Sequence, residues 1–353
     1  MFLERLATCR GGWELANAGD YLDDSTPCFH RRQYGAVQRR PNITPSAIAE
    51  WCVEVFGAAP AATLFEGGHL SQVMGIELFN GRRIVVKARE WQDRLVACAQ
   101  VQRALFASGF PAPELLVGPD RWGDGYAISA EQLVEGGGQA PDEPGMARRF
   151  AEGLAWLVRS ALSPSEIGTL APSPQWVGWD RADEALWPEP DDRDGDLNAH
   201  GGDPWLDDIA RAARARLLGI ASPCVVGHGD YYSRNVQWHG DQLLAVHDWD
   251  SVVAQPEAAI VGQAAAVWPG TVAPGEIATV EQTEEFLDGY LMARGAARSK
   301  GWIEDSWAAG LWVRAFDAKV ASLSAEDPSL VLTPTEAQER MQRAGLSTRW
   351  VNW

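Results

Sequence analysis

His228-Gly229-Asp230-Tyr231-Tyr232-Ser233-Arg234-Asn235 is one half of the stretch from which the fold can be inferred; after eleven intervening residues comes the other half, His247-Asp248-Trp249-Asp250. The segment from Asn235 to Asp248 has the pattern of a β-hairpin with a turn centred on Asp241-Gln242. In that register Asn235 and Asp248 face each other at the open end of the hairpin, on one side of the ribbon. Asp230 lies on the loop that leads into this open end.

These three side chains have the chemistry of a phosphoryl-transfer site. A hard cation needs converging oxygen ligands, and the amide carbonyl of Asn235 and the carboxylate of Asp248 supply two. Asp230 then stands beside the cation and can accept a proton from a hydroxyl group. Phosphoryl transfer needs such positioning and charge neutralisation, and little covalent work from the protein. A surface hairpin with incidental polar residues is the alternative, and three residue types at fixed spacing argue against it.

The quoted motifs resemble those of the aminoglycoside-phosphotransferase and choline-kinase family, which shares the protein-kinase fold. The family loop His-Gly-Asp-x-x-x-x-Asn matches His228 to Asn235, and its Asp-Trp or Asp-Phe metal motif matches Asp248-Trp249. The resemblance implies ATP as the phosphoryl donor, with Asp230 as the catalytic base. It also implies that Asn235 and Asp248 bind Mg²⁺, and that His228 braces the loop.

A glycine turn and a strand lysine in the first part of the chain fit the same interpretation. The turn carries Gly67, Gly68 and Ser71 between two predicted strands, and its backbone N–H groups could bind phosphates. Sixteen residues beyond Ser71, Lys87 ends an apolar strand, where ATP phosphates would give a buried lysine a partner. A lysine that snorkels at a strand edge is the alternative. We therefore expect Lys87 to bind nucleotide and to take part in catalysis.

The predicted strand from Tyr126 to Val134 ends in a segment similar to the family's hinge. By that resemblance the Gln132 carbonyl and the Val134 N–H would hold adenine, whereas an ordinary strand end fits the same residues. No Gly-x-x-x-x-Gly-Lys-Ser/Thr sequence occurs, which argues against a P-loop enzyme.

The sequence departs from the family pattern at two places. The family pairs the strand lysine with a helical glutamate, but the predicted helix from Leu95 to Ser108 has no acidic residue. Gln100 lies on this helix, and Glu90 and Asp93 precede it. After the metal motif the family carries an aspartate that this chain lacks, and Glu257 is the candidate to replace it.

The order of predicted elements gives the fold class. Thr44-Pro45 predicts the start of a helix that ends near Phe56, and Asn80-Gly81 predicts a tight hairpin between strands. Beyond residue 138 the pattern changes to helices. This order gives an α+β class with a strand-rich first part, and the family resemblance implies a bilobal, protein-kinase-like fold with a small antiparallel-sheet lobe and a larger, mainly helical lobe. The expected divisions are an N-terminal extension (1–43), the nucleotide-binding lobe (44–138) and the acceptor-binding lobe (139–353).

Composition restricts the partners. The 353 residues carry a net charge of −18, which disfavours nucleic acid and anionic membranes and favours a cationic small molecule. No apolar run reaches the length of a membrane span. The five cysteines are scattered, as expected of reduced thiols in a cytoplasmic protein. No pattern in the sequence indicates an oligomeric state.

Half of the excess charge lies in a single segment, residues 180–208, which we call the acidic segment. It carries eleven acidic residues and two arginines, and four tryptophans lie in or beside it: Trp176, Trp179, Trp187 and Trp205. Carboxylates bind ammonium groups and aromatic faces bind sugars and cations, so we expect an aminated-sugar acceptor here. A solvated acidic loop with core tryptophans is one alternative. Kinases for neutral sugars, amino alcohols or other small metabolites, and a non-catalytic nucleotide-binding scaffold, are the others.

Overall fold

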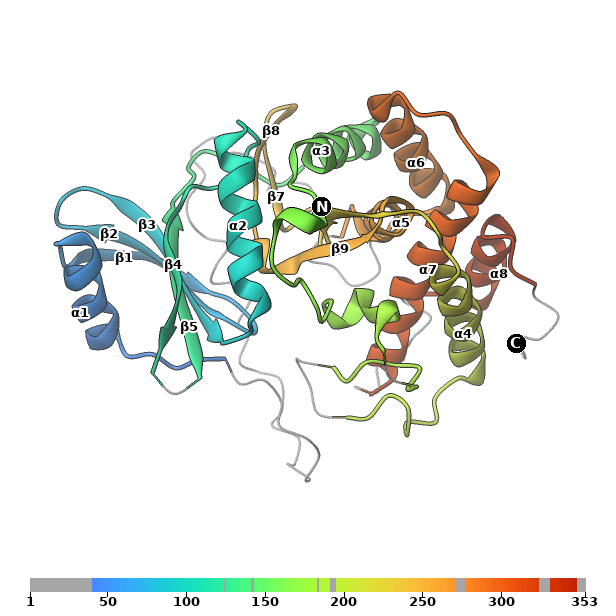
Figure 1. The fold of residues 1–353 in the computed structure, drawn as a ribbon, viewed down its shortest axis with the longest axis horizontal. Helices are drawn as coiled ribbons and strands as arrows, with labels where there is room; N and C mark the ends of the chain where they lie inside the picture. Colours follow the sequence, from blue (N-terminus) through green and yellow to red (C-terminus); the bar gives the residue numbers. More distant parts are fainter. Residues whose placement is uncertain are drawn as a thin grey trace, which may run out of the picture.

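The computed structural model describes residues 40–123, 125–140, 143–182, 184–190, 195–270, 277–323 and 331–347. These residues form a part built on a sheet and a part built mainly of helices, side by side (Figure 1). The predicted α+β class with an antiparallel sheet before a helical region is therefore confirmed. Most of the predicted N-terminal extension, residues 1–39, lies outside the described residues.

The first helix, α1 (Pro45–Phe56), begins and ends where its sequence signals predict. The Thr44 hydroxyl accepts a hydrogen bond from the Ala47 N–H, which satisfies one of the free donors at the helix start. Gly57 ends the helix in the left-handed conformation, with φ 67°. Ile48, Trp51 and Cys52 form its buried face, and they pack on one face of the sheet.

The sheet has five antiparallel strands in the order β1-β2-β3-β5-β4. Along β3, Ile84 and Val86 are buried in the core shared with α1, so the alternating residues Val85 and Lys87 point to the opposite face. That face lies toward the helical part in Figure 1. The strands are β1 (Pro60–Gly67), β2 (Gln72–Leu78), β3 (Arg83–Glu90), β4 (Leu115–Trp122) and β5 (Tyr126–Gln132).

Strand β4 was not predicted, and its sequence explains why. Gly118-Pro119 interrupts it, and glycine and proline normally mark turns. Its pairing with β5 shifts register once before this dipeptide and once across it, so the strand is an irregular edge strand.

Helix α2 (Arg94–Ala107) connects the two parts of the molecule. Four of its buried residues belong to the hydrophobic core of the helical part: Ala97, Cys98, Val101 and Leu105. The helix is therefore packed on the larger part, although it is joined in sequence to the sheet. Figure 1 shows it between the two.

The helical part contains the predicted helical face of Met146, Phe150, Leu154 and Leu157, all buried. Helix α5 was not predicted, because nine of its eleven residues are buried and no polar face alternates with an apolar one. No helix in the described part is long and apolar enough to cross a membrane. The helices are α3 (Met146–Ser160), α4 (Pro204–Leu218), α5 (Glu257–Val267), α6 (Val280–Arg294), α7 (Lys300–Leu323) and α8 (Pro334–Arg343).

Two short antiparallel pairs of strands lie where the helical part meets the sheet. Strand β6 (Cys224–His228) pairs with β9 (Val252–Pro256), and β7 (Val236–His239) pairs with β8 (Gln242–Val246). The end of β6 and the start of β9 lie together, since His228 pairs with Val252. These pairs carry the loops of the candidate active site.

Candidate active site

The topology of the two strand pairs brings three predicted site residues together. Asp230 follows β6, and Asp248 precedes β9, at the same end of one pair. Asn235 precedes β7, and Asp248 also follows β8, at the open end of the other pair. The loops are joined directly, because the Gly229 N–H donates to the Ser251 carbonyl at 2.7 Å.

The predicted register of the β7–β8 hairpin was wrong by one residue. Val236 pairs with Val246 rather than with residue 247, and the His247 N–H donates to the Asn235 carbonyl at 2.8 Å. The turn lies at Gly240-Asp241, and the pairing shifts between Gln237 and Trp238. The prediction assumed that paired residues are equally far from one turn centre, and an irregular ladder of this kind breaks that assumption.

The shifted register alone would place the Asp248 side chain on the opposite side of the hairpin from Asn235, and the backbone conformation of Asp248 compensates for this. One residue of slip moves a side chain to the other face of a ribbon. Asp248, however, is the one described non-glycine residue with a positive φ, at 63°. This left-handed conformation ends the strand and starts the short turn Trp249–Ser251. The buried Trp249 fixes the turn by donating from Nε1 to the Val246 carbonyl at 2.8 Å.

Asp230 is held by Asn235 and by the loop itself. The Asn235 amide Nδ2 donates to the Asp230 carboxylate at 2.8 Å and to its carbonyl at 2.9 Å. The Asp230 N–H donates to His228 Nδ1 at 3.1 Å, so His228 Nε2 carries the proton and donates to the His247 carbonyl at 2.9 Å. His228 therefore braces residues 229–235, the candidate catalytic loop, against the segment that begins at His247, as predicted.

Burial and neighbouring charges shift the pKa values of these groups in different directions. Burial lowers the pKa of His228 to about 4, which keeps the ring neutral for its bracing role. Burial, and then the charge of Asp248, raises the pKa of Asp230 to about 7. Burial alone would raise the pKa of Asp248, but the adjacent Lys87 and Arg89 hold it well below its usual range.

Lys87 reaches across from the sheet to the metal motif. Its ammonium forms an ion pair with Asp248 and a second with Asp250, at 2.9 Å. Arg89, two residues along the same face of β3, also pairs with Asp250. Lys87, Arg89, Asp248 and Asp250 line a small cavity of about 70 Å³ between β3, α2 and the metal motif. Sequence reasoning gave Asp250 and Arg89 no role, although Asp250 stood two residues from a predicted metal ligand.

Helix α2 contacts the metal motif through an arginine. Arg94 is buried and donates to three carbonyls, those of Leu170, Asp250 and Val252. Gln100, on the same helix, accepts a hydrogen bond from the Gly168 N–H at 3.4 Å.

The two acidic residues before α2 lie away from Lys87. Asp93 has 83 % of its side chain exposed and pairs with Arg121, and Glu90 is exposed.

The glycine turn lies in line with Lys87 across the sheet. Gly67 pairs with Val73, and Val73 pairs with Lys87. Gly68 has φ 93°, and a Cβ atom there would lie 2.1 Å from the Ser71 carbonyl oxygen. Only glycine allows this close approach, so the turn brings its backbone next to the row that contains Lys87.

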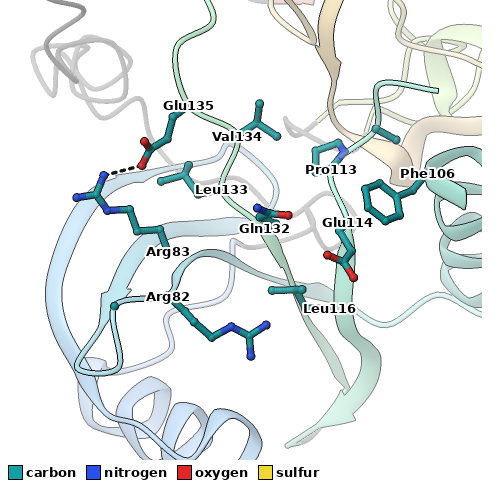
Figure 2. A pocket seen from close by; sticks show the side chains of 12 residues that line it. Arg82, Arg83, Phe106, Pro113, Glu114, Leu116, Gln132, Leu133, Val134 and Glu135 are labelled. Carbon is teal, nitrogen blue, oxygen red and sulfur yellow. Dashed lines mark hydrogen bonds and ion pairs between the residues drawn. The ribbon is translucent and has the colours of Figure 1, made fainter. Parts of the chain in front are cut away.

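The predicted hinge lines a different and larger cavity. Figure 2 shows Gln132, Leu133, Val134 and Glu135 beside a cavity of about 680 Å³, with Arg83 paired to Glu135 at 2.6 Å. Lys87, Asp230, Asn235 and Asp248 do not line it. Within the described part of the chain, the Val134 N–H makes no hydrogen bond, so the adenine contact predicted for it is available.

The tryptophans of the acidic segment do not form the expected acceptor surface. Trp179, Trp187 and Trp205 are buried in the core of the helical part, as the alternative interpretation held. Only Trp176 is partly buried, and its Nε1 donates to the Gly229 carbonyl of the catalytic loop at 2.8 Å. The acidic residues at 191, 192 and 194 lie outside the described residues.

Glu257 does not lie with the metal motif. It starts α5, where its carboxylate accepts hydrogen bonds from Tyr290 Oη at 2.8 Å and from Arg294 Nε at 2.9 Å. These contacts join α5 to α6, so Glu257 has a structural role.

Comparison with known sequences identifies the family. The profile described as the phosphotransferase enzyme family matches residues 63–302, about two thirds of the chain. No curated protein matches the sequence significantly. The matched residues include the glycine turn, Lys87, the catalytic loop and the metal motif.

Solved structures share the fold at low sequence identity. Spectinomycin phosphotransferase, in complex with ADP and spectinomycin, is 14 % identical with a TM-score of 0.53, over 86 % of this chain and 94 % of that one. Amicoumacin kinase, with AMP-PNP, Ca²⁺ and Ami, is 10 % identical with a TM-score of 0.57, over 85 % and 92 %. A choline/ethanolamine kinase family protein from Mesorhizobium loti is 14 % identical with a TM-score of 0.50, over 86 % and 94 %. The chain belongs to the phosphotransferase enzyme family and has its protein-kinase-like fold.

Proposed function

We propose that this phosphotransferase transfers the γ-phosphoryl group of ATP to a hydroxyl group of a small, cationic, aminated sugar, such as an aminoglycoside or an amino sugar. The observation that carries the proposal is the convergence of Asp230, Asn235 and Asp248 opposite Lys87. These residues come from the two parts of the molecule, as a site between a nucleotide and an acceptor requires. Several solved relatives were determined with ADP or AMP-PNP, which supports ATP as the donor.

Lys87 and the glycine turn would bind the phosphates of ATP. Gly67 and Lys87 share one row of the sheet, so backbone N–H groups and an ammonium group are presented together. The Gln132 carbonyl and the Val134 N–H would hold the base. In this arrangement Lys87 exchanges its contact with Asp248 for a contact with phosphate oxygens.

The residues present fit a magnesium ion. Asn235 and Asp248 offer an amide oxygen and a carboxylate, the hard oxygen donors that Mg²⁺ prefers. The described residues contain no cluster of three or more histidine, cysteine or acidic side chains that could hold a metal alone. Phosphate oxygens of ATP and water would complete the coordination, as is usual for this ion. When bound, Mg²⁺ neutralises phosphate charge and orients the phosphates.

Asp230 would orient the acceptor hydroxyl toward the γ-phosphorus and accept its proton as the new P–O bond forms. The bond from the γ-phosphorus to the β–γ bridging oxygen breaks in the same transfer, and ADP leaves. Its carboxylate is fixed by Asn235, and its backbone is fixed by His228. A fixed carboxylate favours one hydroxyl geometry, which is the main contribution of a protein to this reaction.

The charge of the molecule supports a cationic acceptor. Beyond the net charge of −18, a further carboxylate besides Asp248, that of Asp317 on α7, lies close enough to Asp230 to raise its pKa further. A positive group on the acceptor would relieve the repulsion between the two carboxylates. Because most of the segment's tryptophans are buried, the proposal rests on charge and no longer on aromatic stacking.

An ATP-consumption assay with separate acceptor classes tests the proposal. Aminoglycosides and hexosamines should support turnover, while neutral hexoses and amino alcohols should support much less. Asp230→Asn protein, purified in parallel, measures the background. Turnover with neutral hexoses alone would refute the cationic acceptor, and no phosphoryl transfer to any class would refute the catalytic assignment.

A further inference from the structure

The partner of Lys87 comes from the metal motif, not from helix α2. In the described part of the chain, the ammonium of Lys87 is paired with Asp248 and Asp250. Helix α2 has no acidic residue, and its contact with the motif is made by Arg94. The two carboxylates therefore hold the ammonium group of Lys87, which in the proposed function contacts the phosphates of ATP.

Asp250 is the more deeply placed of the two carboxylates. Only 10 % of its side chain is exposed, against 34 % for Asp248. Its Oδ2 atom pairs with both Lys87 and Arg89. Its carbonyl accepts hydrogen bonds from Arg94 and, at 3.8 Å, from the Cys98 thiol, so its backbone is fixed to α2.

Asp248 cannot remain the partner of Lys87 during the proposed reaction. A carboxylate that ligates a cation has little free charge left for a neighbouring ammonium group, and the cation itself repels that group. Asp250 has no such competing task in the arrangement described above. Lys87 would thus keep one fixed carboxylate when it leaves the other.

We propose that Asp250 is the positioning residue of Lys87: it holds the ammonium group in place for the nucleotide phosphates while Asp248 binds the metal. The inference rests on the proposed function, because it assigns a nucleotide to Lys87. It differs from a metal-ligand role for Asp250, which would require that carboxylate to leave Lys87 and Arg89.

The composition of the chain provides a direct measurement. The sequence contains three lysines, Lys87, Lys300 and Lys319. Lys300 has 89 % of its side chain exposed, and Lys319 is fully buried in contact with Asp207. Brief acylation of the full-length protein with an amine-reactive ester, followed by peptide mass spectrometry, gives the Lys87 signal relative to the Lys300 reference, with Lys319 as the protected control.

Four proteins are compared without nucleotide: wild type, D250N, D250E and D120N. D250N removes one carboxylate from Lys87 and should raise its relative labelling by about fivefold, the order expected for one partly buried ion pair. D250E keeps the charge and should stay within about twofold of wild type. D120N removes a charge from an exposed position in the same sheet and should have no effect. Equal labelling of Lys87 in all four proteins would overturn the proposal.

A second arm repeats the labelling with Mg²⁺ and ADP. Nucleotide should protect Lys87 in wild type and D250E, and less in D250N. With ATP as substrate, D250N should raise the KM for ATP by about tenfold, with an unchanged KM for the acceptor. If D250N instead shifts the Mg²⁺ requirement and leaves Lys87 labelling unchanged, Asp250 is a metal ligand and the proposal is wrong.

The two arms separate the inference from the function on which it rests. If Mg²⁺ and ADP fail to protect Lys87 in wild type, the nucleotide assignment fails, and the positioning role falls with it. If they protect wild type and D250N equally, the nucleotide assignment stands and only the positioning role is refuted.

Discussion

Asp230 is the residue on which the proposed chemistry depends most. Asp230→Asn keeps the shape of the side chain and an oxygen that can accept the Asn235 hydrogen bond, but it removes the proton acceptor. We expect kcat to fall by about 10²- to 10⁴-fold, the usual contribution of general-base catalysis, with ATP binding nearly unchanged. Both quantities should be measured on one preparation, with Asp241→Asn on the exposed hairpin turn as the control. Turnover within a few-fold of wild type would remove Asp230 from the mechanism.

Asp248 combines a ligand role with an unusual backbone, and two substitutions separate them. Asn and Ala both remove the charged ligand, so each should abolish turnover even at saturating Mg²⁺. At φ 63°, however, alanine costs about 1 kcal/mol or more, whereas asparagine adopts this conformation readily. Urea unfolding should therefore show Asp248→Ala less stable than Asp248→Asn by about that amount. Equal stability of the two variants would contradict the backbone argument, and retained activity in either would contradict the metal assignment.

The sequence predicted that Asp230, Asn235 and Asp248 lie together, and the structure brings them together, but their detailed geometry could not be predicted. The spacing of Asp230, Asn235 and Asp248 identified the loop and the motif. The predicted hairpin register was wrong because the ladder shifts between Gln237 and Trp238, and the left-handed backbone of Asp248 compensates for that shift. Neither feature can be predicted from the spacing of the motif residues. The pairing of Asp250 with Lys87 depends on a contact across more than 160 positions, which a single sequence does not encode locally.

Among the elements, α2 shows how one buried side chain can join two parts of a molecule. Arg94 donates to the carbonyls of Asp250 and Val252, directly after Asp248, and to the carbonyl of Leu170 in a segment distant in sequence. Arg94→Gln leaves most of these buried acceptors unpaired, so the free energy of unfolding should fall by about 3 kcal/mol. Loss of kcat should accompany it, because the motif is no longer fixed to the helix. Arg211→Gln, on the exposed surface of α4, is the matched control and should change stability by less than about 0.5 kcal/mol.

Prediction of the elements themselves succeeded where local signals are strong. Helix α1 has an N-cap threonine, a proline at its first position and a glycine at its end, and it was found at those bounds. Strand β4 and helix α5 were missed, one because Gly118-Pro119 interrupts it and the other because it is buried on nearly every side. In both cases tertiary packing decides the structure against the local signal.

At the scale of the whole molecule, part of the acidic segment is bound to helix α7 of the helical part by an ion pair and hydrogen bonds. Lys319 on α7 is fully buried and binds the Asp207 carboxylate at 2.9 Å and the carbonyls of His200 and Gly201 at 3.1 Å. Asp207 also accepts a hydrogen bond from Trp187 Nε1 at 2.7 Å. Lys319→Met should therefore lower the free energy of unfolding by about 3 kcal/mol, because a partly buried carboxylate and two carbonyls lose their donor. Lys300→Met, at an exposed position, should change it little, and similar losses for both would contradict this role.

The net charge of −18 leads to a prediction that separates cationic from neutral acceptors. Half of the excess lies in residues 180–208, and Asp317 adds negative charge close to Asp230. Such a field attracts a polycationic acceptor over distances that salt controls, since the screening length falls from about 10 Å at 0.1 M to about 3 Å at 1 M.

Raising KCl over this range should therefore increase the KM for a polycationic aminoglycoside by about tenfold or more. The KM for a neutral sugar should stay nearly constant, because an uncharged molecule has no long-range electrostatic attraction for salt to screen. ATP is anionic, so its KM should not rise through the same effect, and it reports general damage from salt. Parallel slopes for the cationic and neutral acceptors would mean that the charge serves another purpose, and the acceptor would then have to be sought among the neutral hydroxyl compounds.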